Sequence, residues 1–255
     1  MAPPLVTIDA AEPIEKIIEI IEKDGGVIIS NFLSPDLLKE TMDAIEPHFK
    51  GRKITIQKLP TMNLVPSSFP RDLSSLLSKI PVQLTKIVRL SVWKSIMAHF
   101  LNDEFSFHTG ETLVPQKSGY MLASTATLRL IPGAKPQPLH RATAVIPGSH
   151  LWGADRAPKK EECTYAEMEP GSALFTLGST YHGAGENKCE HTDPEALRTL
   201  IAVFAPDQDE VLSTPIEIAR KLPEDVLRLA GYYKAVSGVG YVQDQHPIEM
   251  MDISQ

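Results

Sequence analysis

Short strand-like segments, separated by turn residues, constrain the fold of this chain most. They are rich in Val, Ile, Leu, Thr and Phe, and Gly or Pro stands beside most of them. The segments cover residues 121–130, 142–146, 173–177 and 197–204. Short strands at such intervals are typical of an antiparallel sandwich or jelly roll. We therefore predict a mainly β core in this part of the chain.

Helices are predicted on both sides of the β core. Isoleucines recur at helical spacing over residues 14–21, and two glycines end that pattern before a short apolar strand. Further helical patterns follow before residue 104, and Pro81 separates two of them, at about 72–80 and 82–100. We predict one domain over residues 1–255, with a mainly helical part at 1–104, a β core at 105–207 and a helical tail at 208–255.

Composition and charge narrow the classes of partner. Apolar residues make up 42% of the 255 residues and charged residues 22%, as in an ordinary globular protein. The net charge is −7 and no Lys/Arg run occurs, so we expect neither nucleic acid nor a membrane as partner. The most apolar stretch, 82–101, contains three basic residues and suits an amphipathic helix. Two cysteines, Cys163 and Cys189, are expected to be free thiols in a cytoplasmic protein.

Two histidines stand where a β core could bring them together. His140 lies between two strand-like segments, and His182 lies in the glycine-rich string GSTYHGAG. Two imidazoles and a carboxylate form the iron site of many non-haem oxygenases. Alternatively, each is a half-buried histidine held by hydrogen bonds. A third histidine, His150 in PGSH, is expected to stabilise a turn.

Arg198 opens the apolar segment RTLIAVF. We expect this arginine to be buried among Leu and Ile, where it needs an anionic partner, because its charge cannot be neutralised. That partner is either a carboxylate of the protein or a small dicarboxylate cosubstrate.

Several motifs in one order carry a resemblance to a known family. They read VPQKSGYMLAST, QPLHR, AVIPGSHLW, AEMEPGSALFTLGSTYHGAGEN and LRTLIAVF. Together they resemble the phytanoyl-CoA dioxygenase family, and are most similar to its fungal iron(II)/2-oxoglutarate-dependent dioxygenases of secondary metabolism. The likeness extends over nearly the whole chain.

The resemblance implies a fold, a cofactor and a set of residues. The fold is a double-stranded β-helix, a cupin-like jelly roll, packed on the N-terminal helices. Iron, as Fe(II), is held by His140 and His182, while Arg198 and Gln137 bind 2-oxoglutarate; O2 is the other cosubstrate. The resemblance also implies a small-molecule substrate and a possible homodimer.

The sequence departs from the family pattern at the first histidine. The family has His-Arg-Asp, with the Asp as third iron ligand, whereas this chain has His140, Arg141 and Ala142. It then continues directly into a segment that lies well downstream in the family, so a strand and its loops are missing. A lost exon, a degenerate member without iron, or an alanine that admits chloride would each explain this. Ala142 aligns better with the following strand, which disfavours chloride, and Asp155 is the nearest downstream carboxylate.

We therefore predict a dioxygenase that oxidises a small-molecule intermediate in fungal secondary-metabolite biosynthesis. The alternative is a non-catalytic family member that acts as a binding or partner subunit. We expect His140 and His182 to lie close together, with Arg198 pointing into the same cavity and no carboxylate completing the site. The irregular stretch at 50–70 is a candidate lid.

Overall fold

The computed structural model describes residues 3–49, 72–122, 124–130, 144–183, 189–190, 192–193, 197–205 and 214–232. Two compact units divide the chain. The first unit comprises Met1–Asp43, Phe49–Asp72 and Leu128–Leu200, and the second comprises Ala44–His48, Leu73–Thr127 and Ile201–Gln255. The predicted single domain stays a prediction, and each unit is described by itself.

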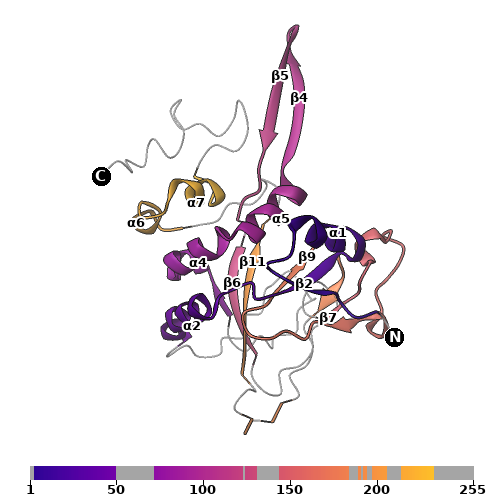
Figure 1. Ribbon diagram of the computed structural model, residues 1–255. Helices are drawn as coiled ribbons and strands as arrows, with labels where there is room; N and C mark the ends of the chain where they lie inside the picture. The colour runs from indigo at the N-terminus through magenta and orange to yellow at the C-terminus, as the bar shows by residue number, and fades with distance from the viewer. Residues whose placement is uncertain are drawn as a thin grey trace, which may run out of the picture. The chain divides into compact units, whose positions relative to one another are not determined.

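A β-α-β segment begins the first unit (Figure 1). Strand β1 (Thr7–Asp9) pairs in parallel with β2 (Gly26–Ser30), and helix α1 (Ile14–Asp24) connects them. The isoleucine pattern explains α1, because Ile17 and Ile21 lie one turn apart and are both buried. The predicted helix, its glycine end and the strand after it are confirmed.

The same unit contains short strands that lie within the sequence motifs AVIPGSHLW and AEMEPGSALFTLGSTYHGAGEN. Strand β9 (Ala173–Thr176) pairs antiparallel with β2, and β7 (Ala144–Val145) pairs antiparallel with β10 (His182–Gly183). Between β7 and β9 the chain forms two 3-10 helices, Ser149–Leu151 and Lys160–Glu162, and then strand β8 (Thr164–Tyr165). Buried Leu5, Ile28 and Val145 form a small core with Ala166, Met168 and Leu174.

Helices and a hairpin make up most of the described residues of the second unit. They are α3 (Leu76–Lys79), α4 (Pro81–Val88), α5 (Ser91–Leu101), α6 (Ile216–Ala219), α7 (Glu224–Leu229), β4 (Asp103–Thr109) and β5 (Thr112–Ser118). Pro81 opens α4 at the position where a missing N–H costs nothing. Side chains on α4, α5 and α7, such as Leu84, Ile96 and Leu227, are buried.

Some elements have residues in both units. They are α2 (Pro35–Phe49), β3 (Asp72–Ser74), β6 (Ser124–Leu130) and β11 (Arg198–Phe204). Strands β11, β6 and β3 form a three-stranded sheet in that order. The described strands thus form separate sheets of two or three strands, without a closed barrel. Mixed helices and sheets are confirmed, and the double-stranded β-helix stays a prediction.

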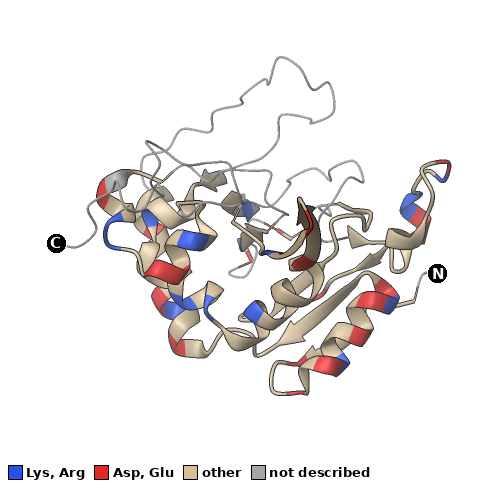
Figure 2. Ribbon diagram, turned by 90° about the horizontal axis from the view of Figure 1, so that it is seen from above, with Lys and Arg blue, Asp and Glu red and all other residues tan. Residues whose placement is uncertain are grey.

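Acidic and basic residues are interspersed along the helices (Figure 2). Several of them form ion pairs one helical turn apart, such as Lys39 with Asp43 at 2.5 Å and Arg228 with Glu224 at 2.9 Å. Exposed pairs of this kind contribute little to stability. None of the described helices has both the length and the apolar composition needed to cross a membrane.

An ion pair connects the residue after α4 to α7 within the second unit. The Arg89 guanidinium donates to both carboxylate oxygens of Asp225, at 2.7 and 2.8 Å. Partial burial alone would raise the pKa of Asp225, but the hydrogen bond and charge of Arg89 outweigh it and hold that pKa below its usual value. The pair is about half exposed, so solvent screens it.

Replacing Arg89 by Gln tests this pair. We expect the free energy of unfolding at pH 7 to fall by about 0.5–1 kcal/mol, the upper range for exposed pairs. Because the pKa of Asp225 is lower in the folded state, its ionised carboxylate stabilises the folded protein at pH values above its unfolded-state pKa of about 3.9. This stabilisation is lost as the pH falls through the folded-state pKa. The free energies of unfolding of the two proteins, measured in urea between pH 7 and pH 3, should therefore converge at low pH. Arg228→Gln is the control, with a smaller loss, and a deficit that persists unchanged to pH 3 contradicts this account.

Candidate functional site

The carbonyl of Gly25 anchors the loop that precedes His182. Gly25 ends α1 in the left-handed conformation, with φ +76°. Its carbonyl oxygen accepts hydrogen bonds from the N–H of Leu177, at 2.9 Å, and from the Thr180 hydroxyl, at 2.8 Å. Thr180 is fully buried, so its hydrogen bond is shielded from water. The loop between β9 and β10 is therefore fixed to the end of the first helix.

The PGSH turn binds the same helix end. The N–H of Gly148 donates to the carbonyl of Asp24 at 2.7 Å, and Nε2 of His150 donates to the carbonyl of Glu22 at 2.9 Å. Carbonyls in the last turn of a helix have no partner inside it, so these two bonds satisfy them. The turn at His150 is confirmed, as part of a 3-10 helix, and the helix contact was not predicted.

The PGSH turn also binds the strand that carries His182. Ser149 is 1% exposed, and its hydroxyl oxygen accepts a hydrogen bond from the N–H of Tyr181 at 2.9 Å. The carbonyl of Tyr181 in turn accepts the N–H of Ile146, also at 2.9 Å. His182 then lies opposite Val145 in the pairing of β10 with β7. The end of α1, the PGSH turn and strand β7 thus determine where His182 lies.

The geometry of His182 suits a metal ligand that binds through Nε2. The side chain is buried, at 8% exposure, and Nδ1 lies 2.7 Å from the carbonyl oxygen of Thr180. Because a carbonyl only accepts, Nδ1 carries the proton, and in the neutral imidazole Nε2 carries the lone pair. Histidines that bind metals commonly donate their other N–H to a carbonyl in this way.

Arg198 differs from the expectation. It is exposed and lies at the first residue of β11, so the prediction that it is buried is wrong. Its Nη2 lies 3.8 Å from Sγ of Cys189. The first residue of a strand has fewer neighbours than its middle, and Leu197 beside it is exposed too. Binding of 2-oxoglutarate by Arg198 stays a prediction.

The buried arginine is Arg129, which sequence reasoning missed. It is 5% exposed, its guanidinium lies 3.8 Å from the ring centroid of Phe49, and its Nε donates to the Thr199 hydroxyl at 3.3 Å. Along β6 it alternates with two other buried polar residues, Thr125 and Thr127. The period of two in TATLR was the available signal for this polar face.

The remaining predicted residues lie outside the described part of the chain. These are His140 and Gln137, together with Ala142 and the candidate lid at 50–70. The predicted approach of His140 to His182 therefore stays a prediction. Among the described residues, no three His, Cys, Asp or Glu side chains gather where they could hold a metal. Asp155 is exposed in the loop after Leu151.

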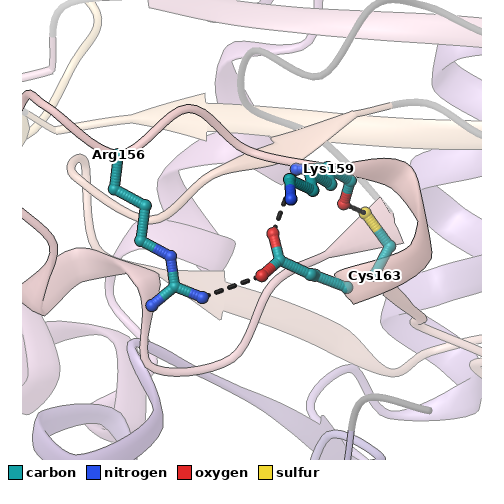
Figure 3. A network of polar contacts seen from close by, with 4 residues as sticks. Arg156, Lys159 and Cys163 are labelled. Carbon is teal, nitrogen blue, oxygen red and sulfur yellow. Dashed lines mark hydrogen bonds and ion pairs between the residues drawn. The ribbon is translucent and has the colours of Figure 1, made fainter.

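A network of polar contacts joins Arg156, Lys159 and Cys163 in that loop (Figure 3). The guanidinium of Arg156 lies 3.5 Å from the ring centroid of Trp152, which contacts Tyr181 with ring centroids 6.1 Å apart. Nη2 of Arg156 donates to Glu162 at 2.8 Å, and the other carboxylate oxygen accepts the N–H of Lys159 at 3.1 Å. The loop from Trp152 to Glu162 is thereby tied to the residue before His182.

Cys163 closes this network and is not suited to act as a nucleophile. Its thiol lies 3.9 Å from the carbonyl oxygen of Lys159. Burial, followed by the charges of Glu161 and Glu162, raises the pKa of the Cys163 thiol, so the thiol stays protonated. Neither Cys163 nor Cys189 forms a disulfide in the structure.

A family comparison covers the part of the chain that contains His182. Residues 139–192 match the sequence model of the family described as Phytanoyl-CoA dioxygenase (PhyH). The match begins one residue before His140 and includes the PGSH turn.

Curated relatives are similar over most of the chain. Dioxygenase swnH1 of Arthroderma benhamiae is 26% identical over 287 residues, which covers 96% of this chain and 91% of the relative. Dioxygenase trt7 of Aspergillus terreus is 27% identical over 252 residues, covering 83% and 80%. The first alignment is longer than the chain: 96% of 255 residues is about 245, so about 40 of its 287 positions contain no residue of this chain.

Solved structures share the fold. The non-heme alpha ketoglutarate dependent carbocyclase SnoK from nogalamycin biosynthesis has a TM-score of 0.54 and 14% identity, covering 85% of this chain and 92% of that one. EctD from S. alaskensis with bound Fe has a TM-score of 0.55 and 13% identity, covering 84% of each chain. At these identities the likeness shows the fold alone.

Replacing Gly25 by Ala tests the anchor of the site. A Cβ at Gly25 would lie 2.4 Å from Nδ1 of His150 and 2.6 Å from Oγ1 of Thr180. We expect the free energy of unfolding to fall by about 2–4 kcal/mol, from left-handed strain of roughly 1–2 kcal/mol plus the steric clash. Gly148→Ala is the matched control, with φ +75° and open space around its Cβ. Equal losses for the two variants in urea unfolding contradict the packing described above.

Proposed function

We propose that this chain is a member of the phytanoyl-CoA dioxygenase family of 2-oxoglutarate-dependent dioxygenases, and that it oxidises a small-molecule intermediate of fungal secondary metabolism. The proposed cofactor is iron(II), and the cosubstrates are 2-oxoglutarate and O2. The two relatives named above as dioxygenases, both from fungi, support this proposal. We include a cytoplasmic location and a homodimer in it.

The hydrogen bond of His182 is the observation that carries the proposal. Its Nδ1–H donates to the buried loop carbonyl of Thr180, and that loop is in turn fixed by Gly25. This arrangement orients the imidazole before any metal binds, so little conformational freedom is lost on binding. A structural histidine makes a similar bond, and only metal binding distinguishes the two roles.

The remaining roles follow the resemblance and are part of the proposal. His140 would supply the second imidazole, and Gln137 and Arg198 would bind the carboxylates of 2-oxoglutarate. When bound, the metal supplies the oxidative decarboxylation of 2-oxoglutarate and the oxidation of the substrate. The protein side chains hold and orient these groups. We further propose that the β core follows the double-stranded β-helix of the family, with one strand missing.

We propose that the missing strand lies between Arg141 and Ala142. The alignment positions without a residue of this chain, about 40, are enough for a strand with its loops. Strand β7 begins at Ala144, two residues after the alanine that stands where the family has an aspartate. This supports reading Ala142 as the approach to β7 and disfavours a chloride site.

Loss of the aspartate has a direct physical consequence. The carboxylate is the only anionic ligand among the three that the family provides, so two neutral imidazoles alone leave the metal charge uncompensated. We therefore propose that iron binding and turnover by this chain are weak. The alternative is a non-catalytic member that acts as a binding or partner subunit, and the relatives named as dioxygenases favour the catalytic function.

Succinate formation tests the proposal. Purified protein receives iron(II), ascorbate and 2-oxoglutarate, and is compared with a variant in which the corresponding segment of the swnH1 relative is inserted after Arg141. We expect slow turnover that rises roughly a hundredfold on insertion, the effect of placing one ligand correctly. His182→Ala should abolish activity in both proteins, and exposed His99→Ala should leave it unchanged. If the inserted protein is equally inactive, the non-catalytic alternative is favoured.

A binding measurement tests Arg198 separately. Arg198→Met should weaken 2-oxoglutarate binding at least tenfold in titration calorimetry, because a charged hydrogen bond contributes about 1.5–3 kcal/mol. Arg220→Met, which removes an exposed positive charge elsewhere, is the control. Equal affinity of the Arg198 variant and the unchanged protein would rule out Arg198 as the residue that binds the cosubstrate.

A further inference from the structure

The hairpin of β4 and β5 lacks the support that a two-stranded sheet needs. All seven residues of β4 are exposed, including Phe105 at 45% and Phe107 at 40%. The two strands form a sheet of their own among the described residues, and Figure 1 shows them projecting beyond α5. An isolated hairpin is marginal in water, and more strands with an apolar face stabilise it. The exposed phenylalanines indicate a surface that another strand covers.

The turn determines which backbone groups face outward. Gly110, with φ +61°, and Glu111 form a two-residue loop between Thr109 and Thr112. In such a hairpin the two residues next to the turn, Thr109 and Thr112, exchange backbone hydrogen bonds. Farther along the strands, non-hydrogen-bonded and hydrogen-bonded pairs alternate. The pair of Ser106 with Pro115 is consequently not hydrogen-bonded, so the N–H and C=O of Ser106 point away from β5.

The two outer edges of the hairpin differ. On β5 the middle outward position is Pro115, which has no N–H, so that edge cannot form a complete ladder. On β4 the outward groups belong to Glu104, Ser106 and His108, and all three have an N–H. Only the β4 edge is therefore suited to pair with a further strand.

The sequence of β4 is complementary to itself about its central residue. In an antiparallel pair centred on Ser106, Phe105 lies opposite Phe107, and Glu104 lies opposite His108. Oε1 of Glu104 accepts a hydrogen bond from Lys117 of β5 at 2.5 Å, and the other carboxylate oxygen can accept one from the imidazole of His108 in the second copy. This register also places the outward backbone groups of both strands opposite each other. A register shifted by one residue would pair outward with inward groups, and it would lose both side-chain matches.

We propose that β4 pairs antiparallel with β4 of a second copy of this chain, about a two-fold axis through Ser106. Two hairpins then form one four-stranded sheet, and the phenylalanines of both copies lie together on one face. Each strand is the other's partner, as a closed two-fold interface requires. The proposal rests on the homodimer of the proposed function and names its interface, but it needs neither iron nor turnover.

Removing one outward N–H tests the pairing. Ser106→Pro deletes the central N–H of the edge and leaves the hydrogen bonds of the hairpin intact, since that N–H does not bond to β5. Ser106→Thr keeps the N–H and is the matched control. In sedimentation velocity at 1–100 µM, about the range expected of a small interface, we expect a dimer for the unchanged protein and Ser106→Thr, and a monomer for Ser106→Pro. Circular dichroism checks that all three fold.

A charge exchange tests the register independently. His108→Glu places like charges opposite each other at both ends of the pair, and should weaken the dimer at least tenfold. The double variant Glu104→His with His108→Glu restores opposite groups across the two-fold axis, and should recover dimerisation. A monomeric unchanged protein at 100 µM overturns the proposal. A dimer that is equally stable in Ser106→Pro, or one that the double variant fails to restore, also overturns it.

Discussion

The two hydrogen bonds accepted by the carbonyl of Gly25 determine the arrangement of the first unit. They join the end of α1 to the loop after β9, at Leu177 and Thr180. The PGSH turn satisfies further carbonyls of the same helix, and its Ser149 binds the residue before His182. The helix end thus serves as an attachment point for segments that lie more than a hundred residues away in the sequence. Glycine is required there, because the left-handed conformation and the crowding by His150 exclude a side chain.

The His182 imidazole is oriented as a metal ligand would be, while His140 and Gln137, which the resemblance assigns to the same proposed site, lie outside the described residues. The imidazole of His182 is buried and oriented by a backbone carbonyl. The position where the family has an aspartate is Ala142. A positioned imidazole without an anionic neighbour still has affinity for a divalent metal, but it compensates none of the metal's charge. The weak iron binding that we propose follows from this departure in charge, and the fixed position of His182 does not depend on it.

Local patterns predicted the parts of the fold that depend on local interactions. The isoleucines of α1 and the glycines after it determine a helix, its end and the next strand, and all three were predicted. Arg198 shows where such reasoning fails, because its exposure depends on its place at the start of β11 and not on its apolar neighbours. Arg129 and the β4–β5 hairpin were missed, although both show a period of two in the sequence. Long-range contacts such as that between Gly148 and Asp24 have no local signal.

The state of the His182 imidazole tests the central claim most directly. Long-range ¹H–¹⁵N NMR of the imidazole reports which nitrogen carries the proton and whether the other binds a metal. The structure predicts a protonated Nδ1, held by the carbonyl of Thr180, and an Nε2 resonance that shifts when zinc(II), a stand-in without redox chemistry, is added. A protonated Nε2, or an Nε2 resonance that does not change with zinc(II), would contradict the assignment of His182 as a metal ligand.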